Sequence, residues 1–90
     1  MAMDTHEISL VTLDGLRLDG DLAVPLGEAP LAGVVLCHPH PRFGGDRHNA
    51  VVNALFTGLG ESGAAVLRFD FRGVNGSEGE HDDGIGERLD

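Results

Sequence analysis

The sequence predicts an α/β domain in which an antiparallel β-hairpin precedes a right-handed strand–helix–strand unit. Three observations support this fold class. Apolar and polar residues alternate over 6–12 and again over 16–24, two mainly apolar runs follow at 31–37 and 64–71, and a helical apolar stripe lies between those runs. Alternation is typical of half-buried strands, whereas continuous apolar runs are typical of strands covered on both faces. Parallel strands joined by a helix cross over with a right-handed sense in nearly every protein.

The hairpin comes first along the chain. The segments HEISLVT and LRLDGDLAV lie on either side of Asp14-Gly15, a dipeptide favoured in tight turns between antiparallel strands. Residues 25–30, PLGEAP, have the composition of a loop. The run LAGVVLC, residues 31–37, then predicts the first strand of the crossover unit, covered on both faces.

The crossover helix is predicted from the spacing of apolar residues after Gly45. They fall at i, i+1, i+4, i+5 and i+8, which is one stripe of a helix: Val51, Val52, Leu55, Phe56 and Leu59. Asp46 is the expected N-cap, because its carboxylate can accept hydrogen bonds from the first turn. Gly63 supplies the left-handed residue that commonly ends a helix.

The rest of the chain predicts a second strand and an unfinished helix. Residues 64–71, AAVLRFDF, predict a buried strand, and residues 72–86 form a loop rich in Gly and acidic residues. Ile85 and Leu89 lie four apart, as at the start of another helix, but one turn is too short to hold without packing. Strands covered on both faces require helices on both sides, and one complete helix is encoded, so a bare sheet face is expected. Residues 1–90 are therefore predicted to be a single partial domain, truncated at its C-terminus.

Charge and composition argue against several classes of partner. Acidic residues number 15 against 6 basic ones, all Arg, for a formal charge of -9. That charge opposes binding to nucleic acid or to anionic membranes. The segment MAMDTHEISL has neither the basic nor the apolar region of a signal peptide, and the apolar runs are too short to span a bilayer. A soluble cytoplasmic protein is expected, and the single cysteine, Cys37, fits a reducing compartment.

The segment LCHPHPRFGG is the candidate functional stretch, and its His-x-His pair, His38 and His40, suggests a metal site first. Two imidazoles do not make one, because zinc sites need three or four ligands. The pattern His-x-His-x-Asp-His fails, since Arg42 and Phe43 occupy the Asp and His positions. Further candidate ligands nearby are Asp46 and His48. A metal site is not expected, and the His38 ring is predicted to hydrogen-bond neighbouring loops instead.

The paired glycines of the same segment suggest a phosphate site next. Gly44-Gly45 before a helix resembles the turn that binds anions at a helix N-terminus. Neither Gly-x-Gly-x-x-Gly nor a P-loop motif is present, and the chain contains no Lys. No cofactor is expected.

A third chemistry fits the segment better: stabilisation of an oxyanion by a main-chain N–H. Such a turn needs a rigid backbone just past a strand, small residues that admit substrate, and a helix that anchors it. Pro39 and Pro41 fix φ and have no N–H, so the donor between them is His40. Gly44 and Gly45 relieve crowding. The alternative is a stiff turn whose histidines are structurally satisfied.

Two stretches together resemble a known family. LCHPHPRFGGDRHNAVVNAL and LRFDFRGVNGSEGEHDDGIGE are similar to the amino-terminal part of the α/β-hydrolase superfamily, in particular to small bacterial predicted serine hydrolases related to dienelactone hydrolase. The resemblance covers residues 31–88 and implies the N-terminal portion of an α/β-hydrolase sandwich, with the leading hairpin as its first two strands.

The resemblance also implies roles for the loops. The loop after the third strand would donate to the oxyanion through His40, and we expect Phe43, Gly44 and Gly45 to border a small-molecule acyl substrate. The Arg-Gly loop after the fourth strand would support the rim of the site. Asn75 stands where the family more often has Gly, and Asn tolerates a left-handed backbone.

A serine hydrolase needs a nucleophile on a sharp strand-to-helix turn, usually within Gly-x-Ser-x-Gly, followed by an acid and a His. The serines available are Ser9, Ser62 and Ser77. The sequence Asn-Gly-Ser-Glu-Gly around Ser77 nearly matches, but no strand runs directly into it and no apolar helix follows, so Ser77 is not expected to be a nucleophile. Cys37 is expected to be a buried structural thiol.

Other ionisable residues are expected to be structural. Asp70 is flanked two positions away by Arg68 and Arg72, which predicts an ion network on one strand face. His81-Asp82-Asp83 is predicted to be a solvated part of an acidic loop.

The expected function is that of an N-terminal fragment of a serine hydrolase acting on an ester, thioester or related acyl substrate. The fragment is expected to be inactive alone, because the nucleophile elbow, the acid and the catalytic His are absent from it. The alternatives are a non-catalytic module or relic that docks through its bare sheet face, and a metal-dependent hydrolase that uses the His-x-His pair. Self-association through the uncovered face is a further expectation.

Overall fold

A computed structural model describes residues 3–27, 29–40, 45–80 and 90. Several predictions from the sequence lie outside these residues and concern the second helix near Ile85 and Leu89, the segment His81-Asp82-Asp83, and the substrate contacts at Phe43 and Gly44.

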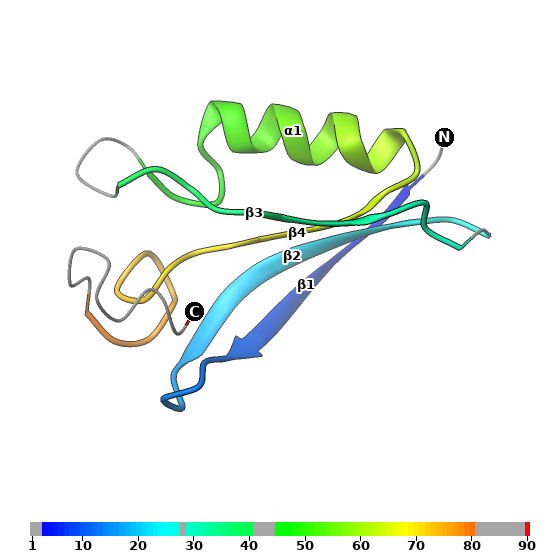
Figure 1. The fold of residues 1–90 in the computed structure, drawn as a ribbon. Coiled ribbons are helices and arrows are strands. Elements are labelled where there is room, and N and C mark those ends of the chain that lie inside the picture. The colour runs from blue at the N-terminus through cyan, green and yellow to red at the C-terminus, as the bar shows by residue number, and fades with distance from the viewer. Residues whose placement is uncertain (1–2, 28, 41–44, 81–89) are drawn as a thin grey trace.

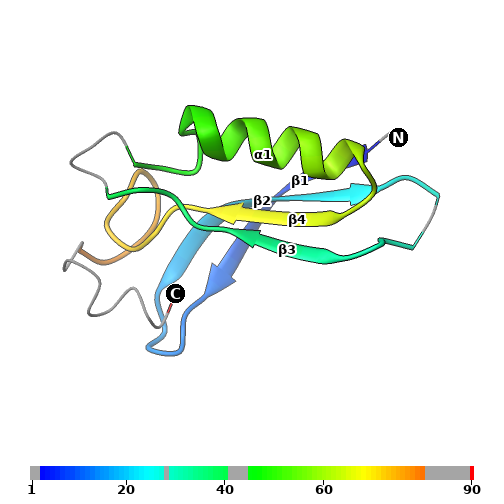
Figure 2. The ribbon, with the colours of Figure 1, turned by 45° about the horizontal axis from the view of Figure 1, so that its top comes forward.

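The described chain forms one mixed sheet with a helix against one face (Figures 1 and 2). Along the sequence the elements are β1 (Met3–Val11), β2 (Arg17–Pro25), β3 (Gly33–Leu36), α1 (Ala50–Glu61) and β4 (Ala65–Phe69). The strand order is β1-β2-β4-β3, in which β1 pairs antiparallel with β2, β2 antiparallel with β4, and β3 parallel with β4. The predicted hairpin and the predicted parallel pair joined by a helix are confirmed.

The hairpin turn forms where the sequence predicts it. Thr12 N–H donates to the Leu16 carbonyl over 2.9 Å, and Gly15 N–H donates to the Thr12 carbonyl over 3.0 Å. The Thr12 hydroxyl adds a local hydrogen bond to Asp14 Oδ1 at 2.5 Å. The turn is therefore closed by its own backbone and by short polar side chains.

The core lies between α1 and the sheet. Its buried members are Ala23, Phe56, Ala64 and Val66, with Met3, Val34, Leu36 and Leu59 packed against them. The predicted helical stripe is wrong for Val51 and Leu55, which are 66% and 46% exposed. Successive helical residues are about 100° apart, and the helix buries a single ridge at positions 52, 56 and 60, so the stripe is narrower than expected.

The cap at the start of α1 differs from the prediction. Asn49, not Asp46, is the N-cap, and its side chain accepts from the N–H groups of Val51 and Val52 at 3.0 and 3.4 Å. Asp46 acts one turn earlier, where its carboxylate accepts from His48 N–H at 2.7 Å. At the other end Gly63 has φ 102° just beyond the helix, as predicted.

The sheet face away from α1, called the open face below, has no helix over it in the described part of the chain (Figures 1 and 2). Leu67 on this face lies opposite Leu22 in one neighbouring strand and Val35 in the other. Val35 is 61% exposed, and Leu22 and Leu67 are half-buried. Within the described residues β3 is thus covered on one face only, and its other face is the bare face expected of a chain that encodes one complete helix.

Among the described residues, no helix has both the length and the apolar character needed to cross a membrane.

Candidate functional site

The loops that follow β3 and β4 lie at the same end of the sheet (Figures 1 and 2). They meet because β3 and β4 are parallel neighbours, so their carboxyl ends coincide. In open α/β sheets this edge is where ligands bind. The candidate segment around His38 and His40 therefore faces the segment that begins at Asp70.

His38 joins the two loops. Its ring is buried, Nε2 accepts from Phe71 N–H at 3.0 Å, and Nδ1 lies 2.7 Å from the Pro39 carbonyl oxygen. A carbonyl can only accept, so Nδ1 carries the hydrogen and the imidazole is the neutral tautomer. The ring also packs edge-on against Phe71, with centroids 4.6 Å apart. The predicted role of His38 as a hydrogen-bonding partner of a neighbouring loop is confirmed for Nε2, and Nδ1 is bonded within its own loop.

Gly45 closes the turn that contains His40. Its N–H donates to the His40 carbonyl over 3.2 Å. A Cβ placed on Gly45 would lie 1.6 Å from the Pro39 carbonyl oxygen, so only glycine lets the backbone approach so closely. Gly45 is therefore needed for the shape of the turn. His40 itself is half-buried at the carboxyl end of β3.

Asp70 holds the chain just after Gly45, at Arg47. Its side chain is completely buried, Oδ1 accepts from the backbone N–H of Arg47 at 2.8 Å, and Oδ2 accepts from Arg47 Nη1 at 2.6 Å. Asn75 Nδ2 adds a contact to Oδ2 at 3.3 Å. An ion network was predicted at Asp70, but with the wrong partners: neither Arg68 nor Arg72 pairs with it.

Arg68 belongs to a second pair beneath α1. Its Nε donates to Asp21 Oδ2 at 2.9 Å, its Nη1 donates to Asn53 at 2.9 Å, and its guanidinium lies 4.1 Å from the centre of the Phe56 ring. Arg47 Nε also reaches Asp21 Oδ2, at 3.2 Å. Two arginines and two aspartates thus form one neutral, mostly buried cluster, the arrangement that buried charges require.

Arg72 ties the β4 loop to the hairpin. Its two terminal nitrogens donate to Asp14 at 2.8 and 3.0 Å, and its Nε and Nη2 donate to Asp90 at 3.0 and 2.7 Å. Hydrogen bonds from Arg72 lower the pKa of Asp14 to about 2, and the two carboxylates raise the pKa of Arg72. This clamp fixes Arg72 to the hairpin turn and to Asp90, and the role of its loop at the rim of the site stays a prediction.

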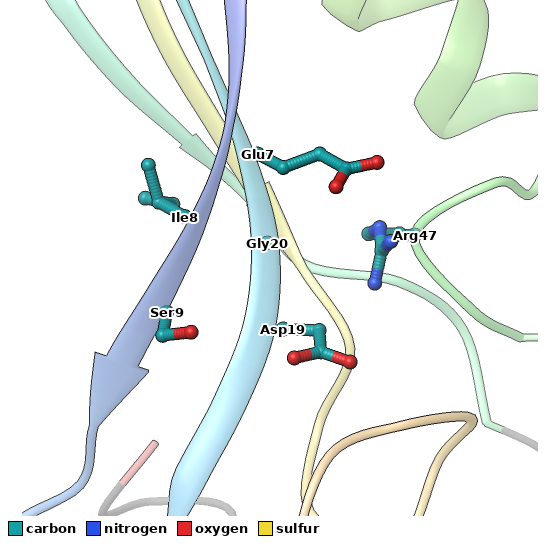
Figure 3. A pocket seen from close by; sticks show the side chains of 6 residues that line it. All are labelled: Glu7, Ile8, Ser9, Asp19, Gly20 and Arg47. Atoms are coloured by element: carbon teal, nitrogen blue, oxygen red, sulfur yellow. The ribbon is translucent and has the colours of Figure 1, made fainter.

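A pocket of ≈ 250 Å³ lies beside β1 and β2 and is lined by Glu7, Ile8, Ser9, Asp19, Gly20 and Arg47 (Figure 3). The side chains of Glu7, Asp19 and Arg47 gather on one side of the two strands, whereas Ile8 points to the other side. Of the predicted donor and substrate residues that the structure describes, neither His40 nor Gly45 lines it. Among the described residues, no group of three or more His, Cys, Asp or Glu side chains is placed to hold a metal ion.

Known proteins and solved structures that are similar to this chain indicate its fold family. No family model matches it. A curated relative, the uncharacterized protein RP471 of Rickettsia prowazekii, is 47% identical over 75 residues. An alpha-beta serine hydrolase homologue from Coxiella burnetii matches 94% of this chain at 37% identity with a TM-score of 0.79. XC6422 from Xanthomonas campestris, a serine hydrolase without a lid, matches 100% of it at 33% identity and 0.82. The chain has the fold of the amino-terminal portion of an α/β-hydrolase.

The match concerns the amino-terminal portion of the hydrolase fold. The chain spans 31% of the Rickettsia relative, 40% of the Coxiella hydrolase homologue and 42% of the Xanthomonas hydrolase. Within this hydrolase portion, the mixed sheet and its single described helix are those predicted from the sequence.

Ser77 is built into the hydrolase fold as a structural residue. It is buried, its hydroxyl donates to the Asp70 carbonyl at 2.7 Å, and the same oxygen accepts from Asp19 N–H at 3.0 Å. A hydroxyl committed to two backbone groups is not poised for attack on a substrate. Two residues earlier, Asn75 has φ 47°, the left-handed backbone predicted for it.

Cys37 is exposed, which contradicts the prediction of a buried structural thiol. β3 ends at Leu36, one residue earlier, so Cys37 has left the strand and the sheet does not enclose it. The protein around the thiol still removes enough water to raise its pKa. A raised pKa keeps the group in its thiol form at neutral pH, and the thiol is a poor nucleophile.

Proposed function

We propose that this chain is the oxyanion-binding part of a serine hydrolase that acts on an ester, thioester or related acyl substrate. In this proposal the His40 N–H is one of the donors to the negatively charged oxygen that develops during acyl transfer. The observation that carries it is the position of His40, which lies past the end of β3 at Leu36, between two prolines of the sequence, with its carbonyl bonded to Gly45 N–H.

His40 suits this role because contacts of His38 and Gly45 hold the chain on either side of it before a substrate arrives. Pro39 and Pro41 restrict φ on both sides of His40, and the His38 ring binds the turn to Phe71. A donor that is fixed in advance costs no reorganisation when charge develops, which is the source of oxyanion-hole catalysis. The neutral tautomer of His38 is committed to structure, so it is not the general base in this proposal.

Phe43, Gly44 and Gly45 are proposed to border the acyl group. Gly45 supports this because its N–H donates to the His40 carbonyl, which keeps it next to the proposed donor. The nucleophile, the acid and the catalytic His are proposed to come from outside these 90 residues, since Ser77 and Cys37 are unsuited to attack. An exposed free thiol at Cys37 favours a cytoplasmic location, where thiols remain reduced.

The test uses the product of the longest reading frame that contains this chain, assayed with p-nitrophenyl acetate. Replacing His40 by Pro removes the proposed donor N–H, and kcat is expected to fall by about 100- to 1,000-fold. Ala29→Pro is the matched control, because it adds a proline beside Pro30 in an exposed loop remote from the site. A folded His40→Pro protein with undiminished kcat, or a full-length wild-type protein without esterase activity, would overturn the proposal.

A further inference from the structure

We propose that Asp70 and Arg47 are positioning residues for the His40 donor: the buried carboxylate of Asp70 fixes the segment that carries His40 by holding both the backbone and the side chain of Arg47. The inference rests on the proposed function. It names a role for two residues that act on His40 through the geometry of the turn.

The first step is the two-point contact between these residues. Asp70 Oδ1 accepts from the Arg47 backbone N–H at 2.8 Å, and Oδ2 accepts from Arg47 Nη1 at 2.6 Å. A contact at both backbone and side chain sets the position and the orientation of residue 47. Gly45, two residues earlier, carries the constraint onward because its N–H holds the His40 carbonyl.

The second step is that His40 lies between two anchors. On its amino-terminal side His38 accepts from Phe71 N–H at 3.0 Å. On its carboxyl-terminal side Arg47 is held by Asp70. Asp70 and Phe71 are consecutive residues just past β4, so one short segment holds both sides of His40, Phe71 through its backbone N–H and Asp70 through its side chain. A shift of this piece would move the turn as a unit.

The third step concerns the negative charge of Asp70, which strengthens its hydrogen bonds to Arg47 and is offset by the positive charge of Arg47. The carboxylate is completely buried, while Arg47 keeps 15% of its side chain exposed. The buried charge is offset by Arg47, and the neighbouring pair of Asp21 and Arg68 is balanced in the same way. Hydrogen bonds to charged groups are stronger than neutral ones, so Asp70 holds Arg47 more firmly than an amide would.

Asp21 provides a matched control for the test. It is also a buried aspartate, and it also contacts Arg47, but only at Nε and at 3.2 Å. Its stronger contact is with Arg68, beneath α1. Asp21→Asn and Asp70→Asn therefore remove the same charge from the same cluster, and only Asp70→Asn weakens the hold on the backbone of residue 47.

The experiment compares both variants in the product of the longest reading frame, with p-nitrophenyl acetate as substrate. Asp70→Asn is expected to lower kcat by about 10- to 100-fold with KM changed less than about twofold, because a displacement of about 1 Å in a catalytic group costs up to about 100-fold. Asp21→Asn is expected to lower the urea midpoint by a similar amount and to keep kcat within about twofold of wild type. Equal losses of kcat in the two variants would overturn the positioning role.

Amide hydrogen exchange by mass spectrometry separates this inference from the proposed function. Exchange in peptides covering residues 45–49 is expected to accelerate at least about tenfold in Asp70→Asn and to stay near the wild-type rate in Asp21→Asn. If wild type lacks esterase activity while this pattern appears, the proposed function fails and the anchoring of the turn stands. Unchanged exchange in Asp70→Asn overturns the anchoring, whatever the activity.

Discussion

Phe71 donates its backbone N–H to Nε2 of His38 over 3.0 Å, and this bond joins the loop after β3 to the loop after β4. The same imidazole has its Nδ1 against the Pro39 carbonyl, so a single buried ring satisfies one donor and one acceptor of the backbone. Buried polar groups without partners destabilise folded proteins, which makes the ring a structural requirement of the site.

His38→Ala is therefore expected to lower the free energy of unfolding by about 1–3 kcal/mol, because it leaves the Phe71 N–H without its acceptor. His38→Gln is expected to recover part of the loss, since an amide oxygen can accept from the same N–H. Urea denaturation followed by circular dichroism measures both. His6→Ala serves as the control, because the His6 side chain is 53% exposed. A loss at His38 no larger than that at His6 would contradict the structural role.

Gly45→Ala is expected to open the turn around His40. The new Cβ would meet the Pro39 carbonyl oxygen at 1.6 Å, and because that atom is backbone the chain itself must move. The matched control is Gly58→Ala in α1, where an added Cβ meets nothing within 4 Å. That change is expected to stabilise the protein by about 0.5–1 kcal/mol, the helix preference of Ala over Gly.

Thermal unfolding of the two glycine variants gives a simple readout. The melting temperature should fall for Gly45→Ala and rise for Gly58→Ala. If both variants melt above wild type, the close approach at Gly45 is not a constraint on the turn.

The clamp between Arg72 and Asp14 predicts a pH dependence of stability. Hydrogen bonds from Arg72 lower the pKa of Asp14 from 3.8 to about 2 in the folded state. A depressed folded-state pKa stabilises the protein above the unfolded value, and the contribution disappears as pH falls through the folded value. The difference in unfolding free energy between wild type and Asp14→Asn should therefore be constant above about pH 5 and shrink between about pH 4 and pH 2.

Urea titrations at a series of pH values measure this difference. Glu61→Gln, at the exposed end of α1, provides the comparison for a general loss of negative charge. A difference between wild type and Asp14→Asn that grows as the solution is acidified would have the wrong sign for this clamp.

The sequence predicted the elements better than it predicted their side-chain partners. Alternation and the Asp14-Gly15 turn were enough to place β1 and β2, and the apolar runs placed β3 and β4. The alternation along β4 did not predict which arginine pairs with Asp70. β4 ends at Phe69, so Asp70 lies beyond the strand and does not share a strand face with Arg68 and Arg72. Its partner, Arg47, is brought over the strand end by the turn before α1.

The start of α1 was likewise not predicted correctly from the sequence pattern. The N-cap was expected at Asp46 because its carboxylate can accept hydrogen bonds from the first turn, but Asn49 lies directly before the first helical residue and caps it. An extra turn with Asp46 bonded to His48 N–H comes first, and nothing in the spacing of apolar residues distinguishes the two positions. Likewise, the exposure of Cys37 depends on where β3 ends, which an apolar run alone does not fix.

The open face predicts self-association of the isolated 90-residue chain. Val35 is 61% exposed there, beside the half-buried Leu67 and Leu22. Contiguous exposed apolar surface drives contact between molecules. Val35→Glu is expected to shift the population toward monomer in sedimentation velocity. Val51→Glu, on the exposed side of α1 at 66% exposure, is expected to leave it unchanged. A monomeric wild-type chain at high micromolar concentration would contradict the prediction.

The isolated 90-residue chain is expected not to hydrolyse p-nitrophenyl acetate faster than its Ser77→Ala and Cys37→Ser variants do. Ser77 has its hydroxyl bonded to the Asp70 carbonyl and to Asp19 N–H, and Cys37 has a raised pKa, so neither supplies a nucleophile. An oxyanion donor stabilises charge only after a nucleophile has attacked, and loss of the nucleophile from a serine hydrolase costs about a million-fold in turnover. Activity in the wild-type chain that disappears in either variant would show that these residues form a complete catalytic site by themselves.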